Sequence, residues 1–174
     1  MKLLPPSEHG TDSGNQFAHI KGFGKVIVST GIQTPDAIFH LGDYFKDTFF
    51  LKEHYPDIPL YAVPGNCDRY QNSFLPPEDC VVRVDGLRFY LTHGHRQGVK
   101  QGLGRLIAEG RAAKAHAVVY GHTHVACISV EEGMYVINPG SCGFFGSSAA
   151  IIETDGEKIT DCRILRQSDL EEIV

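Results

Sequence analysis

The sequence has no long apolar run, no secretory leader and no regularly spaced set of cysteines. The 174-residue chain is therefore expected to stay out of the membrane. Its five cysteines are an odd number at irregular spacing, so they indicate neither a disulfide framework nor a paired CxxC zinc site. Together these absences favour a reducing cytoplasm as the location.

Excess positive charge is absent as well. A formal net charge of −5 argues against nucleic-acid binding driven by bulk electrostatics. It does not exclude a small phosphate ester that is drawn to a local metal ion. No combination of aromatic and basic residues typical of a single-stranded nucleic-acid groove is evident, so nucleic acid is not an expected partner.

The chain shows no internal repeat, low-complexity tract or domain linker. Its length predicts a single domain over 1–174, with an atypical N-terminal region. The apolar fraction of 42% and the charged fraction of 21% are ordinary for a globular protein. The 19 glycines are many for this length, and several stand beside His, Asp or Asn.

Hydrophobic patterning predicts strands alternating with helices through the first two-thirds of the chain, and a strand-rich last third. The expected helices are Tyr44–Tyr55, Val99–Lys114, Ser168–Val174 and, without a clean helical period, Gln16–Ile32. The expected strands are Asp36–Leu41, Leu60–Val63, Cys80–Val84, Leu87–Leu91, Ala117–Tyr120, Ala126–Val130, Met134–Ile137, Ala149–Glu153 and Lys158–Leu165. This order predicts an α/β sandwich with sheets in the middle and helices outside.

The stretch Ala117–Val125 contains two histidines just beyond a predicted buried strand. Gly121 ends that strand, and His122 and His124 follow. In an extended chain, residues two apart point to the same side, so both imidazoles can face one spot. Because neutral imidazole is the commonest metal ligand, this stretch suggests a metal site.

Four predicted strands end in a glycine beside a potential ligand. These ends are Gly42-Asp43, Gly65-Asn66, His93-Gly94-His95 and Gly121-His122-Thr123-His124. Sites in open α/β sheets form beyond the carboxyl ends of the strands, and glycine lets the backbone turn sharply and approach a ligand closely there. Carboxylate, amide oxygen and imidazole together suit divalent ions such as Mn, Fe, Zn or Mg.

Each strand end also has a purely structural interpretation. Gly42-Asp43 alone is typical of a turn, and Gly65-Asn66-Cys67-Asp68 of an Asx-type turn. Taken singly, His93 and His95 fit surface residues, and Asp68 fits an ordinary solvated charge. The occurrence of four such ends in one short chain favours the metal site.

The ordered series of these motifs resembles the calcineurin-like metallophosphoesterase superfamily, and in detail the small bacterial and archaeal phosphodiesterases of the YfcE type. The motifs that carry the resemblance are Gly42-Asp43, Gly65-Asn66-Cys67-Asp68, His93-Gly94-His95, Gly121-His122-Thr123-His124 and Asn138-Pro139-Gly140-Ser141. They imply a four-layer α-β-β-α sandwich that carries a two-metal site.

The resemblance also implies a ligand set. Asp43 would bridge both ions, and one ion's shell would be completed by Asn66, His93 and His122. The other ion would be bound by His9 and His124 with a further carboxylate. Manganese is the expected ion, and zinc, iron, nickel and magnesium suit similar ligands. The turn Asn138-Pro139-Gly140-Ser141 would lie beside the site without a ligand role.

The family's first motif, Asp-x-His at the end of the first strand, is not matched. Ser7 stands at the Asp position when His9 is aligned without a gap, and serine is a poor ligand for a divalent ion. A one-residue deletion would place Glu8 there instead, and Asp12 is a third alternative. Pro5-Pro6 interrupts the strand that should present the motif. We therefore expect one metal to bind tightly and the other weakly or not at all.

The activity that the resemblance implies is hydrolysis of small phosphodiesters by a hydroxide that bridges two metal ions and attacks phosphorus in line. Asn66 and His95 are the predicted catalytic residues, with His95 as the replacement proton donor. Many family phosphatases carry a histidine after this Asn, whereas Cys67 stands there in this chain. Because a thiol is a poorer proton donor at neutral pH, diesters with good leaving groups such as aryl alcohols are expected to be favoured.

Two other functions remain open. A fold that kept the motifs but lost turnover would be a non-catalytic scaffold or binding module, for which the retromer subunit with this fold is a precedent. Ser7 and Pro5-Pro6 favour this alternative, and the intact later motifs oppose it. A structural zinc protein would instead unfold on chelation. Formation of a homo-oligomer is an expectation from relatives alone.

Overall fold

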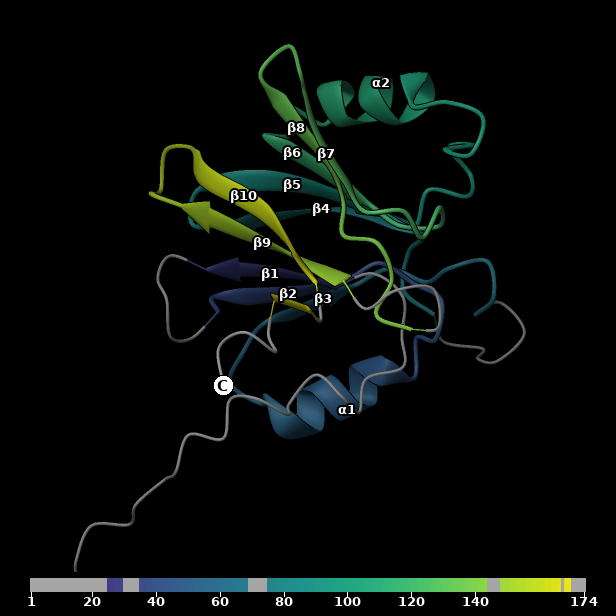
Figure 1. Cartoon of the computed structure of the whole chain (residues 1–174), viewed down its shortest axis with the longest axis vertical. Helices are drawn as coiled ribbons and strands as arrows, with labels where there is room; N and C mark the ends of the chain where they lie inside the picture. Colours follow the sequence, from purple (N-terminus) through teal and green to yellow (C-terminus); the bar gives the residue numbers. More distant parts are fainter. Residues whose placement is uncertain (1–24, 30–34, 69–74, 144–147, 167, 170–174) are drawn as a thin grey trace, which may run out of the picture.

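The computed structural model describes residues 25–29, 35–68, 75–143, 148–166 and 168–169. Within these residues the chain forms ten strands and two helices, and it folds as two sheets with one helix on each outer side (Figure 1). No helix in the described residues is long and apolar enough to cross a membrane.

The first sheet, sheet A, has the strand order β10-β9-β1-β2-β3. Its strands are β1 (Lys25–Ser29), β2 (Ala37–His40), β3 (Leu60–Ala62), β9 (Ser148–Thr154) and β10 (Ile159–Arg166). Strands β2 and β3 are parallel, so their carboxyl ends lie at the same end of the sheet. β1 is parallel to β9 and antiparallel to β2.

The second sheet, sheet B, has the order β4-β5-β6-β8-β7. Its strands are β4 (Asp79–Val84), β5 (Leu87–Thr92), β6 (Ala117–Tyr120), β7 (Cys127–Glu131) and β8 (Met134–Asn138). The three central strands β5, β6 and β8 are parallel. Antiparallel hairpins at Asp85-Gly86 and Glu132-Gly133 add β4 and β7 at the edges.

The main hydrophobic core lies between the two sheets. Phe39 of β2 and Phe89 of β5 are fully buried there, with ring centroids 5.3 Å apart. Helix α2 (Gly104–Ala112) covers the other face of sheet B, where Leu106 packs in a cluster with β6 and β8. Helix α1 (Asp47–His54) covers sheet A on its outer face through Leu51. The resulting layers, helix-sheet-sheet-helix, follow one another down Figure 1, and the α/β sandwich expectation is confirmed.

One predicted helix was wrong. A helix was predicted over Gln16–Ile32, but Lys25–Ser29 forms β1, and the remainder of that range lies outside the described residues. The β-branched run Val26-Ile27-Val28 fits a strand. It supplies the central ladder of sheet A, between β2 and β9, and these tertiary hydrogen bonds outweigh any local helical preference.

Two of the four predicted helices, those predicted to begin at Tyr44 and Val99, start later than expected. Asp43 and Tyr44 have φ values of +50° and +62°, which a right-handed helix does not admit, so α1 begins at Asp47 rather than Tyr44. Gly102 has φ +157°, and α2 accordingly begins at Gly104 rather than Val99. The last predicted helix, Ser168–Val174, lies largely outside the described residues.

Candidate metal centre

Four predicted ligands follow directly after strands of the two sheets. Asp43 follows β2 and Asn66 follows β3, so both come from sheet A. His93 follows β5 and His122 follows β6, so both come from sheet B. The carboxyl ends of these strands meet across the sandwich, where the His93 side chain contacts those of the other three residues.

His93 lies at the centre of this group. Its ring is fully buried, and its Nδ1 lies 2.6 Å from the carbonyl oxygen of Leu41. A carbonyl oxygen only accepts, so Nδ1 carries the proton and donates it. Nε2 of the neutral ring is then an unprotonated lone pair that faces the other ligands. Metal-binding histidines are oriented by this same kind of outer hydrogen bond.

Three polar side-chain atoms surround His93 Nε2. Asn66 Oδ1 lies 3.2 Å away, and Asp43 Oδ2 lies 3.4 Å away. His122 Nδ1 is 3.2 Å from the same atom. Burial lowers the pKa of His93, against the opposing effect of the Asp43 carboxylate. With Nδ1 protonated, Nε2 of the neutral ring has no proton to donate to either oxygen, so a cation among these atoms is favoured.

His122 is also neutral over the physiological range. Burial, the neighbouring His93 and the positive charge of Lys100 lower its pKa to about 4. A histidine must be deprotonated before it can bind a metal ion. The environment of His122 therefore keeps it in its ligating form well below pH 7.

Asp43 is buried, with a side chain that is 4% exposed. Its Oδ1 accepts a hydrogen bond of 3.0 Å from the backbone N–H of Cys67. Its Oδ2 lies between two imidazoles, 3.4 Å from His93 Nε2 and 3.9 Å from His124 Nε2. The carboxylate thus stands between the two parts of the predicted ligand set.

These separations agree with a shared ion. Two ligands bound to one ion at about 2.1 Å are themselves about 3.0–3.5 Å apart, and the three contacts around His93 Nε2 span 3.2–3.4 Å. In the described part of the chain, no three His, Cys, Asp or Glu side chains already enclose one point as a finished ligand set. The donor chemistry therefore fits a divalent ion, with side-chain adjustments needed to enclose it.

Several site residues have left-handed backbone conformations. Asp43, His122 and His124 have φ values of +50°, +68° and +60°. The chain after Gly121 is therefore not extended, and the two histidines are carried by turns. Such conformations cost free energy for residues other than glycine, and they cluster at functional sites.

The loops after β2 and β3 touch backbone to backbone. A Cβ on Gly42 would lie 2.3 Å from the amide nitrogen of Gly65, so no side chain fits there. Asp68 is buried and ties the same loops together. Its Oδ1 accepts from Phe45 N–H and its Oδ2 from Gly65 N–H, each at 2.8 Å. Asp68 is thus a structural carboxylate, and the solvated-charge interpretation was wrong.

His95 and Cys67 flank the predicted ligands. The His95 ring centroid lies 5.4 Å from that of His93 and 6.1 Å from that of His122. Its Nε2 is 4.0 Å from Glu78 Oε2. Cys67 is exposed, and partial loss of hydration together with the Asp43 carboxylate raises its pKa. The Cys67 thiol therefore stays protonated near neutral pH.

Two residues that hold the turns of the site in place were not identified as such from the sequence. Asn138 donates from Nδ2 to the carbonyl of Gly121 at 3.0 Å and to Thr123 Oγ1 at 2.9 Å, which fixes the turn that carries His122. On the other side, Thr92 Oγ1 accepts from Gly94 N–H at 3.2 Å and fixes the turn after His93.

Thr92 is itself held by a buried polar network that reaches helix α2. Its hydroxyl donates to Gln97 Oε1 at 3.1 Å, and Gln97 Nε2 donates to Glu109 Oε2 at 2.8 Å. Tyr90 also donates to that oxygen, at 2.8 Å. Burial raises the pKa of Glu109, but the hydrogen bonds from Gln97, Arg105 and Tyr90 outweigh this effect and lower the pKa overall. Since these residues have no motif spacing, only the structure reveals the network.

The residues of the unmatched first motif, including Ser7, Glu8, His9 and Asp12, lie outside the described residues.

Comparison with known proteins adds a family to this geometry. A family model described as the calcineurin-like phosphoesterase superfamily domain matches residues 18–157. The chain is 32% identical over 107 residues to the probable metallophosphoesterase YsnB of Bacillus subtilis, and the match covers 61% of this chain and 59% of that protein. It is 29% identical over 153 residues to phosphodiesterase MJ0936 of Methanocaldococcus jannaschii, with 80% and 88% covered.

Solved structures share the fold. A predicted phosphoesterase from Streptococcus pneumoniae has a TM-score of 0.62 at 24% identity, with 83% of this chain and 90% of that chain covered. Vacuolar Protein Sorting 29 from Cryptosporidium parvum has a TM-score of 0.58 at 16% identity, with 84% and 100% covered. At these identities the similarity concerns the fold alone.

Proposed function

Because the chain belongs to the calcineurin-like phosphoesterase superfamily, we propose that it is a metal-dependent phosphoesterase that hydrolyses small phosphodiesters. The observation that carries this proposal is the group of potential metal ligands around His93 Nε2. A carboxylate oxygen, an amide oxygen and an imidazole nitrogen lie within 3.4 Å of this buried nitrogen. The relative named as a phosphodiesterase, MJ0936, supports the choice of diesters.

Asp43, Asn66, His93 and His122 would hold one divalent ion. His124, 3.9 Å from Asp43 Oδ2, would serve a second ion together with His9, and Asp43 would be common to both. Mn²⁺ is the proposed ion. When bound, such ions supply Lewis-acid activation of water and neutralise charge on the phosphoryl oxygens.

The chain's own residues would then orient the phosphoryl group and handle protons. Asn66 carries an amide that can donate to a phosphoryl oxygen from Nδ2 while its Oδ1 faces the site. His95, whose ring lies 5.4 Å from that of His93, would protonate the leaving oxygen. Cys67 needs no chemical role, and its raised pKa keeps the thiol protonated near neutral pH. Diesters with good leaving groups would be hydrolysed fastest.

The test is hydrolysis of bis(p-nitrophenyl) phosphate by the full chain with and without Mn²⁺. We expect turnover that Mn²⁺ stimulates and chelation removes. His93→Ala should lower the turnover about 100-fold or more, while Cys67→Ala should keep most of it. Loss of activity in Cys67→Ala would contradict the role given to this thiol, and the absence of any Mn²⁺-dependent turnover would overturn the proposal.

Ion stoichiometry tests the first motif separately. Elemental analysis of protein purified in excess Mn²⁺ should give about one tightly held ion per chain, because Ser7 and Glu8 replace the usual aspartate. Two full equivalents would show that the departure leaves the second position intact.

A non-catalytic binding module is the second candidate, and the unmatched first motif is the observation that favours it. It predicts metal binding without turnover, so the hydrolysis assay and the metal count separate it from the enzyme.

A further inference from the structure

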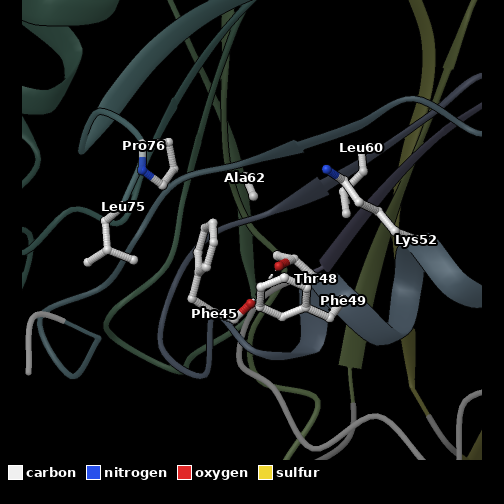
Figure 2. A pocket seen from close by; sticks show the side chains of 8 residues that line it. All are labelled: Phe45, Thr48, Phe49, Lys52, Leu60, Ala62, Leu75 and Pro76. Carbon is white, nitrogen blue, oxygen red and sulfur yellow. Dashed lines mark hydrogen bonds between the residues drawn. The ribbon is translucent and has the colours of Figure 1, made fainter. Parts of the chain in front are cut away.

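A pocket lies between helix α1, strand β3 and the segment that precedes β4 (Figure 2). Its volume is about 460 Å³, which is in the range of small-molecule sites. The lining is mostly apolar and consists of Phe45, Thr48, Phe49, Lys52, Leu60, Ala62, Leu75 and Pro76. We refer to these eight residues as the α1 pocket.

One face of α1 and of the turn before it forms a wall of the pocket. Phe45, Thr48, Phe49 and Lys52 follow the spacing i, i+3, i+4 and i+7, which places them on one side of a helix. Phe49 is 64% exposed, so its ring is largely uncovered by the described residues. The Thr48 hydroxyl donates to the carbonyl of Phe45 at 2.6 Å, which leaves its oxygen as an acceptor. The wall therefore presents two aromatic rings and little competing polarity.

Two parts of the pocket lining are connected to the candidate metal centre by short chain segments. Phe45 follows Asp43 by two residues, and its N–H donates to Asp68, which also holds the loop before Asn66. Pro76 precedes Glu78 by two residues, and the Glu78 carboxylate lies 4.0 Å from His95 Nε2. Phe45 and Pro76 of the pocket thus lie two residues along the chain from Asp43 and Glu78, which contact His93 and His95 of the candidate site.

A cation completes the lining. Lys52 is exposed and makes no ion pair with any residue that the structure describes. In Figure 2 it lies beside Leu60, at the opposite end of the pocket from Leu75 and Pro76. A ligand that fills the apolar part and extends toward Lys52 gains most if it ends in an anion.

We propose that the α1 pocket is a substrate subsite that binds the ring of an aryl or heteroaryl phosphodiester, with Lys52 pairing with an anionic substituent on that ring. This rests on the proposed function. The Phe45 and Phe49 rings offer faces for stacking, and Leu60, Leu75 and Pro76 offer apolar contact. A dialkyl ester too small to reach the rings would leave them in water and would bind more weakly.

Binding is tested without turnover, using the full chain loaded with Mg²⁺ and amide chemical shifts measured by NMR. Diphenyl phosphate is the probe and dimethyl phosphate is its ring-free counterpart. We expect diphenyl phosphate to shift the amides of Phe49 and Lys52, and dimethyl phosphate to leave them unchanged. Phe49→Ala should weaken diphenyl phosphate about 5–10-fold. Val130→Ala removes a side chain that is 53% exposed on β7, and it should change nothing.

The charge of Lys52 is tested with a carboxylate on the ring. Phenyl 4-carboxyphenyl phosphate should bind the parent chain about 2–5-fold more tightly than diphenyl phosphate, a range set by exposed ion pairs. Lys52→Ala should abolish that preference, while Lys52→Arg should keep it. Equal preference in Lys52→Ala would overturn the assignment of the cation.

Kinetics then connect the pocket to the reaction. With bis(p-nitrophenyl) phosphate, Phe49→Ala should raise KM about 5–10-fold and leave kcat nearly constant, whereas Val130→Ala should change neither constant. An equal KM in Phe49→Ala and Val130→Ala, or diphenyl phosphate shifts confined to residues outside the α1 pocket, would refute the subsite. Absence of Mn²⁺-dependent hydrolysis in the parent chain would refute the proposed function instead, so the two failures are distinguishable.

Discussion

The contact between the loops after β2 and β3 gives the sharpest test of how the site is built. Gly42 has φ +85°, and a Cβ placed on it would lie 2.3 Å from Gly65 N and 2.7 Å from Gly65 Cα. Both atoms belong to backbone, so no side chain can rotate out of the way. The substitution Gly42→Ala therefore forces the two loops apart, and these loops carry Asp43 and Asn66.

The expected cost has two parts. An alanine in the left-handed region costs about 1–2 kcal/mol, and forced overpacking adds about 1–3 kcal/mol. Gly133 is a matched control, because its φ of +82° is nearly the same and nothing lies within 4 Å of its hypothetical Cβ. Gly133→Ala should therefore lower the free energy of unfolding by about 1–2 kcal/mol, and Gly42→Ala by about 2–5 kcal/mol.

Urea unfolding of the metal-free protein measures both costs, and calorimetric titration with Mn²⁺ measures the site. Gly42→Ala should weaken Mn²⁺ about 10–100-fold, as loss of outer support for ligands does, whereas Gly133→Ala should leave the affinity unchanged. If the two variants lost equal stability and bound Mn²⁺ equally, the close approach of the loops would have no role in holding Asp43 and Asn66.

Three further predictions concern protons, the buried network and thiols. The pKa of His122 is about 4 in the folded protein, and that of a histidine in the unfolded chain is about 6.5, so the unfolded chain binds more protons between these pH values. The free energy of unfolding of the metal-free protein should therefore fall as the pH is lowered from 6.5 to 4 and should stay constant between pH 7 and 8. Urea unfolding at each pH would show this. Tyr90→Phe removes a hydrogen bond to the Glu109 carboxylate on α2 and should lower the free energy of unfolding by about 1–2 kcal/mol. Tyr135→Phe loses no hydrogen bond among the described residues and should change it little. Equal losses of stability in the two variants would contradict the network. Burial raises the pKa of Cys162 to about 12, so iodoacetamide at pH 8 should label the exposed Cys127 first by mass spectrometry, and the reverse order would refute the burial of Cys162.

The strand-end motifs were predictable because a short apolar run followed by glycine has few alternatives. The runs before Asp43, Asn66, His93 and His122 all form strands of the two sheets, and their side chains meet. The backbone conformations that bring these side chains together could not be predicted from the motifs. The left-handed conformations at Asp43 and His122 are imposed by tertiary contacts, which no local preference announces.

The parts that sequence missed depend on long-range hydrogen bonds. Lys25–Ser29 becomes a strand because β2 and β9 supply partners on both sides, at least 9 residues away along the chain in each case. The network from Tyr90 through Gln97 to Glu109 joins a strand, a turn and a helix. Its residues are ordinary surface-type polar residues in the sequence, and only the packing of α2 on sheet B buries them.

The proposed ligands come in equal numbers from the two sheets, and this division has a consequence for ion selectivity. Leu41 O and His93 Nδ1 connect the sheets at 2.6 Å directly beneath the site, and Phe39 and Phe89 space the sheets further inside. With the proposed ion bound, the spacing of the two sheets would help to set the distance between the ligands of sheet A and those of sheet B. A volume change in that core, remote from every ligand, should then alter the relative affinities of divalent ions.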